Sequence, residues 1–284
     1  MRARARSILA MNQRNLAYIY PNNARRHFPL ADDKLLTKRL MQEGGVPVPR
    51  TYLTCGSLLE TRDLGRKLAA CEDFVIKPAQ GRGGSGVLVV SGRDGDAWVG
   101  SGGRRYSLDA MRKHISDILA GVYSFDLADT AIVEERVRQH SAMSRLSPFG
   151  LADIRVILFK DEPVFAMSRI PTRASQGRAN LHQGAVGVGI DLDSGQTVHA
   201  IFKDQPITEH PETGLPLVGQ MVPEWSEVMR ISRMAAHAVP LKYLGVDICV
   251  SAAGPILLEI NVRPGLEIQN ANAAGLRDRL ESVG

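Results

Sequence analysis

Apolar residues along the chain recur with two periods, one typical of helices and one typical of strands. Apolar stripes at helical spacing lie at 34–41, 107–120 and 223–238, and a further helix is expected between about 57 and 70. Asp32 is expected to cap the first helix and Gly44 to end it. Short apolar runs bounded by Gly, Pro, Asp or Asn predict strands at 16–20, 51–53, 74–77, 87–90, 131–137, 153–159, 163–169, 244–250 and 255–261. This mixture of helices and hairpins indicates an α+β fold.

One predicted strand ends in Lys77 and leads into a glycine-rich turn. The turn runs from Gln80 to Gly86, and a second apolar strand follows it. Glycines let the backbone turn tightly and bring bare N–H groups against a ligand. Such amides beside a lysine suit a triphosphate. Taken alone, the same loop is also compatible with a flexible hairpin turn that binds nothing.

The loop differs from three better known glycine patterns. Gly81-x-Gly83-x-x-Gly86 fits the dinucleotide fingerprint, but that fingerprint opens a helix and a β-branched run follows here. A Walker A loop needs a Gly-Lys pair, which the chain lacks. A protein kinase places its lysine after the loop and carries His-Arg-Asp and Asp-Phe-Gly, neither of which occurs.

The strands at 244–250 and 255–261 predict a hairpin that folds about residue 253. Such a hairpin brings Asp247 opposite Glu259, and period-two alternation puts Glu259 and Asn261 on one face. A charge inside an apolar run is costly unless it is paired or bound to a metal. Two carboxylates and an amide oxygen suit Mg²⁺ with phosphate oxygens. We therefore favour a metal site over a solvated turn acid and an edge-strand charge.

Composition narrows the function classes. The 284 residues allow two or three subdomains, and 44% hydrophobic with 23% charged residues is ordinary for a globular enzyme. The net charge of +5 is dispersed, which argues against a nucleic-acid partner and suits an acidic substrate. Cys55, Cys71 and Cys249 lack metal-site spacing and indicate free thiols. Neither a signal peptide nor a membrane span is predicted, so a cytoplasmic location is expected.

Together these motifs resemble the ATP-grasp superfamily, and within it the RimK-type branch and its alpha-L-glutamate ligase-like proteins. The resemblance covers roughly residues 30 to 280 and rests on Asp33-Lys34, Val75–Lys77 with the glycine loop, Val133–Val137, Asp153–Arg155, Asn180–His182, Gly245–Asp247 and Leu258–Leu266. It implies an ATP-grasp fold, in which two α+β subdomains clasp ATP. The expected parts are a reduced N-terminal segment at 1–30 and an ATP-grasp domain at 31–284, with a glycine-rich lid at about 72–137 and a metal-binding subdomain at about 138–284.

The resemblance also implies roles for single residues. The residues expected to hold ATP are Lys34, Lys77, Gln80, Gly81, Gly83, Gly84, Ser85, Gly86, Glu134, Glu135, Val137 and Asn180. The expected magnesium ligands, with Mn²⁺ as an alternative ion, are Asp247, Glu259 and Asn261. The expected catalytic residues are Arg155, Arg169 and Lys77, and both arginines would also face the acidic substrate.

Several of these residues have ordinary alternatives. Lys34 would also suit a solvated helix surface, and one of Glu134 and Glu135 is expected at the surface because they alternate faces. A structural salt bridge would account for Arg155 nearly as well. His182 is given no catalytic role.

The implied activity is an ATP-dependent carboxylate–amine ligase, with an amino acid such as glutamate among its candidate substrates. The acid attacks the γ-phosphate to give an acyl phosphate and ADP, and an amine then displaces phosphate. A nucleotide-binding module without ligation and a phosphoryl transferase on the same fold are the alternatives.

Two departures from the RimK-type pattern bear on the substrate. Only about 30 residues precede Lys34, which suggests that a partner protein or a second copy of the chain completes the substrate pocket. Asn261-Val262-Arg263-Pro264-Gly265 replaces the usual Asn-Ala-Ser-Pro-Gly, so Arg263 is a further candidate for binding an acidic group. The segment 191–219 is long for the family and is expected to shape the acceptor site.

Overall fold

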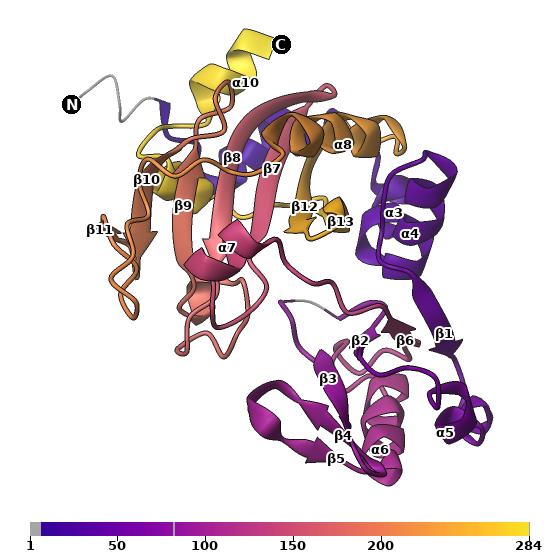
Figure 1. The fold of residues 1–284 in the computed structure, drawn as a ribbon. Coiled ribbons are helices and arrows are strands. Elements are labelled where there is room, and N and C mark those ends of the chain that lie inside the picture. The colour runs from indigo at the N-terminus through magenta and orange to yellow at the C-terminus, as the bar shows by residue number, and fades with distance from the viewer. Residues whose placement is uncertain (1–6, 82, 284) are drawn as a thin grey trace. The chain divides into compact units, whose positions relative to one another are not determined.

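The computed structural model describes residues 7–81 and 83–283 and divides into two compact units (Figure 1). The larger unit comprises Met1–Val48 and Arg138–Gly284, and the smaller one comprises Pro49–Val137. Each unit has its own sheet and its own hydrophobic cluster. The assignment of the smaller unit as a lid and of the larger unit as a metal-binding subdomain stays a prediction.

The smaller unit is a six-stranded antiparallel sheet in the order β1-β6-β2-β3-β4-β5. Its strands are β1 (Thr51–Cys55), β2 (Phe74–Pro78), β3 (Leu88–Asp94), β4 (Ala97–Gly100), β5 (Arg105–Tyr106) and β6 (Ala131–Glu134). Helix α6 (Leu108–Leu119) packs against β2 and β6 through Met111, Ile115 and Ile118, which are fully buried. The expected cap is confirmed, because the Ser107 hydroxyl accepts a hydrogen bond from Ala110 N at 3.1 Å.

The helix expected between 57 and 70 is wrong. That stretch holds the 3₁₀ turn η3 (Leu58–Thr61) and the single-turn helix α5 (Leu64–Lys67), and a second 3₁₀ turn, η4 (Ser101–Gly103), lies further along this unit. Gly65 lies inside α5 and approaches α6 closely, since a Cβ there would lie 3.0 Å from Leu108. Glycine destabilises a helix interior, which accounts in part for the short length of α5.

The larger unit is a seven-stranded antiparallel sheet in the order β11-β10-β9-β8-β7-β12-β13. Its strands are β7 (Asp153–Phe159), β8 (Glu162–Ile170), β9 (Val186–Ile190), β10 (Thr197–Phe202), β11 (Gln205–Ile207), β12 (Tyr243–Ser251) and β13 (Gly254–Asn261). Helix α8 (Trp225–His237) lies along β7, β8, β12 and β13 (Figure 1). The remaining short helices are α7 (Ser141–Leu146), η5 (Leu181–Gln183), α9 (Ile268–Ala271) and α10 (Arg277–Val283).

The N-terminal part of the larger unit is helical. It contains α2 (Met11–Arg14), η1 (Asn15–Ile19), η2 (Arg25–His27), α3 (Pro29–Asp32) and α4 (Lys34–Glu43), of which α3 and α4 contact β13. The strand expected at 16–20 is wrong: η1 is a π-helix, in which Tyr20 N donates to Asn15 O at 2.9 Å. In an apolar run this short, periodicity alone does not distinguish a strand from a helix.

The helix expected from Lys34 is confirmed, but its cap is Asp33 and not Asp32. The Asp33 carboxylate accepts from Leu35 N at 2.8 Å and from Leu36 N at 3.2 Å. Asp32 belongs to the preceding turn α3, so its side chain is not at the capping position.

The predicted register of the β12–β13 hairpin is confirmed. Asp247 pairs with Glu259, and the strands turn at residues 252–253. Strand β6 ends at Glu134, three residues earlier than expected. Among the helices that the structure describes, none has the length and apolar character needed to cross a bilayer.

Candidate active site

Asp247 is the centre of a buried cluster on the larger unit. It lies in the middle of β12, opposite Arg155 of β7 on one side and Glu259 of β13 on the other. Arg155 donates from Nε to Oδ1 and from Nη2 to Oδ2 of Asp247, both at 2.7 Å. The Asp247 side chain is 1% exposed and that of Arg155 is 10% exposed, so this bidentate pair is almost dry.

Arg169 of β8 extends the cluster. Its Nε donates to Asp153 Oδ1 at 2.7 Å, and its Nη2 donates to Asp153 Oδ2 at 2.5 Å and to Asp247 Oδ2 at 2.8 Å. Two arginines and two aspartates therefore form one network across three neighbouring strands. Sequence reasoning assigns Asp153 no role of its own. Its signal is a second polar residue at even spacing from Arg155 in an apolar strand.

The pKa values of the two carboxylates in this network are shifted in opposite directions. Burial alone raises the pKa of Asp247, but Arg155 and Arg169 outweigh burial and hold that pKa well below its usual range. Burial raises the pKa of Asp153 to about 6, although the paired Arg169 lowers it. Asp247 is therefore ionised at neutral pH, which is the state that a metal ligand requires.

The three predicted magnesium ligands come together on this hairpin. Asp247 lies opposite Glu259, and Asn261 Nδ2 donates to Asp247 Oδ2 at 3.0 Å. Within residues 7–81 and 83–283, no group of three or more His, Cys, Asp or Glu side chains could hold a metal ion. The candidate ligands on this hairpin are therefore the carboxylates of Asp247 and Glu259 and the amide oxygen of Asn261. Two carboxylates and an amide fit Mg²⁺ chemically, because that ion prefers hard oxygen donors.

The smaller unit carries a second buried ion pair. Lys77, near the end of β2, places Nζ 2.5 Å from Glu134 Oε1 of the adjacent strand β6, with the two side chains 11% and 6% exposed. Glu135 is exposed, and its backbone N–H donates to Arg50 O at 2.8 Å. The expectation that one of the two glutamates lies at the surface is confirmed.

The glycine loop begins against a buried carboxylate that sequence reasoning missed. Asp129 accepts from Gln80 N at 3.1 Å through each oxygen, from Thr130 N at 2.7 Å, and from the Ser124 hydroxyl. Gly81 follows in a tight turn, where a Cβ would clash with Pro78. An acid in the segment after a helix gives no sequence signal for such a role.

The loop turns through left-handed glycines and ends against α6. Gly83, Gly84 and Gly86 have φ values of 62°, 76° and 73°, a region that side chains rarely adopt. His114 Nε2 lies 2.9 Å from Gly86 O. The loop residues Gln80, Gly81, Gly83, Gly84, Ser85 and Gly86 are thus held at both ends, while Arg82 lies outside the described residues.

The remaining predicted residues lie elsewhere in the two units. Lys34 opens α4 of the larger unit, and Val137 is the last residue of the smaller one. Asn180 caps η5 by accepting from His182 N at 3.0 Å, and His182 Nε2 pairs with Glu267 Oε1 at 2.7 Å. Arg263 is exposed at the loop after β13. The larger unit therefore gathers Arg155, Arg169, Asp247, Glu259 and Asn261, and the smaller unit gathers Lys77, Glu134 and the glycine loop.

These two sheets, with a carboxylate-rich hairpin on one and a lysine and glycine loop on the other, define a protein of the ATP-grasp class. The chain belongs to the sugar-transfer associated ATP-grasp family, whose sequence model matches residues 13–284. The resemblance to the ATP-grasp superfamily is thereby confirmed.

Relatives of this chain include glutamate ligases. It is 26% identical over 260 residues to ribosomal protein bS6–L-glutamate ligase of Escherichia coli O7:K1 and 27% identical to a probable alpha-L-glutamate ligase of Citrobacter koseri. Each match covers 91% of this chain and 64% of the relative. Similar solved structures include D-cycloserine synthetase DcsG, with TM-score 0.49 and 17% identity over 89% of this chain and 69% of that one. Another is D-alanine–D-alanine ligase of Bacillus anthracis, with TM-score 0.49 and 14% identity over 90% and 62%.

Proposed function

We propose that this protein is an ATP-dependent, ADP-forming carboxylate–amine ligase that makes an amide or peptide bond through an acyl phosphate. The observation that carries the proposal is the convergence of Asp247, Glu259 and Asn261 on one hairpin, with Arg155 and Arg169 bonded to the same carboxylate. These three hydrophilic side chains lie within an otherwise apolar strand pair, where a charge is costly unless it is paired or bound to a metal.

The chain's own residues act mainly by placing charge. Asp247, Glu259 and Asn261 would hold Mg²⁺, which neutralises phosphate oxygens when it is bound. Arg155 and Arg169 are fixed by bidentate pairs, so little reorganisation is needed when negative charge develops nearby. Lys77 would contact phosphates of ATP, while the loop from Gln80 to Gly86 would shield the reactive intermediate from water.

Glutamate or a related amino acid is our candidate for one substrate. The names of two relatives support this choice, since both are glutamate ligases at 26–27% identity. Because the chain spans 64% of the length of those relatives, their acceptor proteins are not carried over. The cytoplasmic location and a partner or second copy at the substrate pocket stay predictions.

Product analysis with Mg·ATP tests the proposal. The full chain is incubated with pooled amino acids and small peptides, and ADP, AMP and phosphate are quantified with and without each pool. We expect ADP and phosphate to rise together only when an acid and an amine are both present, and Glu259→Gln to abolish the rise. Tight Mg·ATP binding with no turnover in any pool would favour a nucleotide-binding module, and a stable phosphorylated product would favour a phosphoryl transferase.

A further inference from the structure

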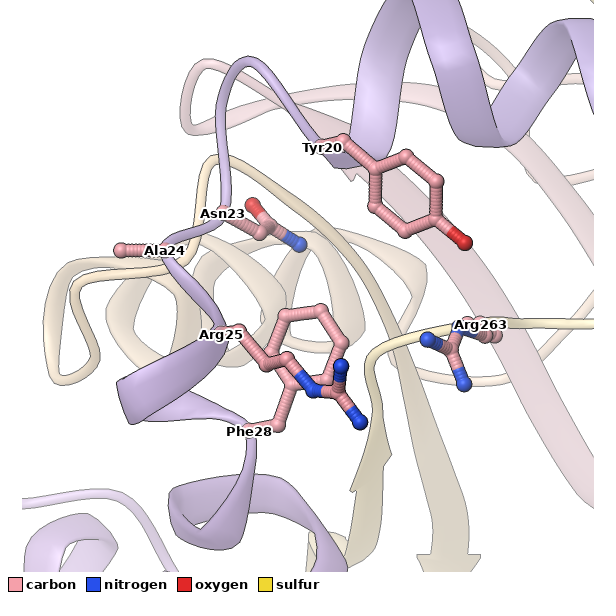
Figure 2. A pocket seen from close by; sticks show the side chains of 6 residues that line it. All are labelled: Tyr20, Asn23, Ala24, Arg25, Phe28 and Arg263. Atoms are coloured by element: carbon pink, nitrogen blue, oxygen red, sulfur yellow. The ribbon is translucent and has the colours of Figure 1, made fainter.

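A pocket of about 550 Å³ opens on the larger unit beside the loop that follows β13 (Figure 2). Most of its wall comes from the segment between η1 and α3, and one residue comes from the far end of the chain. The lining residues are Tyr20, Asn23, Ala24, Arg25, Phe28 and Arg263. Nothing in the Asp247 network or the glycine loop accounts for this pocket.

The pocket carries two arginines whose charges are not balanced locally. The guanidinium groups of Arg25 and Arg263 point toward one another across it (Figure 2). Over the part of the chain that the structure describes, neither group forms an ion pair with a carboxylate. Arg155 and Arg169 differ in this respect, because Asp247 and Asp153 already neutralise them. Arg25 and Arg263 are therefore better placed to attract a free anion.

Both arginines are exposed; the fold anchors the backbone near Arg25 and contacts the Arg263 side chain. Asn23 is buried and ties the segment to β12: its Nδ2 donates to Tyr243 O at 2.6 Å, and its Oδ1 accepts from Lys242 N at 2.8 Å. This anchor fixes the backbone two residues before Arg25. The Arg263 guanidinium lies over the Phe28 ring, 5.2 Å from its centroid, in a cation–π contact.

A third arginine adds to the positive charge beside the pocket. Arg14 is buried, donates from Nη1 to Pro264 O at 2.5 Å, and uses Nε and Nη2 on Asn15 Oδ1. All of these acceptors are neutral. Burial lowers the pKa of Arg14 and the charge of Arg263 lowers it further, while Tyr243 and Glu267 act in the opposite direction. An anion bound near Arg263 would relieve this repulsion.

We propose that the pocket binds an oxyanion between Arg25 and Arg263, and that this oxyanion belongs to the acid substrate. The anion is a carboxylate or a phosphate group, which two guanidinium forks recognise through paired N–H donors. The inference rests on the proposed ligase function in one respect, since that function supplies an acidic substrate. Arg263 is two residues after Asn261 in the sequence, so this arginine is close to one of the proposed magnesium ligands.

Calorimetric titration of the full chain at constant ionic strength tests the pocket without nucleotide. The probes are glutarate, inorganic phosphate and uncharged glutaramide, applied separately. We expect saturable binding of glutarate, phosphate or both, and none of glutaramide. Arg25→Gln and Arg263→Gln should each weaken binding about tenfold or more, because a hydrogen bond between charged groups is lost. Arg26→Gln is the matched control, an exposed neighbour outside the pocket lining, and should stay within about twofold.

The two anions separate the sources of the ligand. Binding of glutarate alone assigns the pocket to a carboxylate, and binding of phosphate alone assigns it to a phosphate group. The proposal is overturned if neither anion saturates, or if Arg26→Gln weakens binding as much as Arg25→Gln. Mg·ATP affinity is measured on the same variants. If the wild-type chain binds the anion but shows no ATP-dependent turnover, the ligase function is contradicted and the anion pocket is not. If both pocket variants still ligate with an unchanged KM for the acid, the anion pocket alone is contradicted.

Discussion

At the scale of single residues, Asp247 is the centre of the buried charged network in the larger unit. It accepts from Arg155, Arg169 and Asn261 while its side chain is only 1% exposed. A carboxylate this dry is stable as an anion only because two guanidinium groups surround it. These hydrogen-bond donors keep Asp247 ionised and fix its position, as its proposed role as a magnesium ligand requires.

Replacing Asp247 should therefore destabilise the protein strongly. Asp247→Asn leaves Arg155 unpaired and Arg169 with one partner fewer, so we expect the free energy of unfolding to fall by about 3–5 kcal/mol. Urea denaturation measures this change. The matched control is Glu162→Gln, which removes a pair between Glu162 and Arg233 whose side chains are 55% and 44% exposed, and it should change the free energy by less than about 1 kcal/mol. Equal losses in the two variants would contradict the special role of the buried pair.

At the scale of elements, the β12–β13 hairpin and the glycine loop differ in how far the sequence predicts them. The β12–β13 hairpin could be predicted with its register, because alternation and a short turn fix which residues face each other. The path of the glycine loop could not, because it depends on Asp129 and His114, which lie 49 and 28 residues from the backbone groups that they bind. Neither contact has a local sequence signal.

The left-handed glycines of the loop give a direct test of its conformation. At Gly86, φ is 73° and a Cβ would lie 2.6 Å from the Tyr123 ring. Gly86→Ala should lower the free energy of unfolding by at least about 1–2 kcal/mol, from backbone strain alone. Gly92→Ala is the control, since Gly92 lies in β3 and a Cβ added there would meet no described atom within 4 Å. An unchanged stability in Gly86→Ala would show that the loop adopts another path.

Burial of His114 at the end of the loop should also make stability depend on pH. Burial lowers the pKa of His114 below its usual 6.5, although the contact with Gly86 O raises it. The folded state therefore binds fewer protons than the unfolded state as the pH falls below about 6.5. The stability present above that pH is lost as the pH falls through the lower folded pKa.

The variant His114→Gln isolates this effect. Between pH 7.5 and 5.5, the free energy of unfolding of the wild type should fall more than that of His114→Gln, as measured by urea denaturation at each pH. Parallel curves for the two proteins would rule out a titrating histidine at the end of the loop.

At the scale of the whole molecule, the fold class could be predicted from the sequence, whereas several side-chain pairings could not. The ATP-grasp class and the α+β fold could be inferred from the motifs and are shown by the family match. The pairing of Arg155 with Asp247 could not be inferred, because it depends on the order of β7 and β12, whose paired residues are 92 positions apart. The pocket between Arg25 and Arg263 could not be predicted for the same reason, because residues far apart in the sequence line it.

The most direct test of the ligase account is a hydroxylamine trap. The full chain is incubated with Mg·ATP, the amino-acid pool and hydroxylamine, and hydroxamate is measured alongside ADP, with Glu259→Gln as the control. If the protein is such a ligase, hydroxamate should require both ATP and an acid, form in step with ADP, and be absent in the control. ADP release that yields no hydroxamate under any acid, or hydroxamate at equal rates in Glu259→Gln, would contradict it.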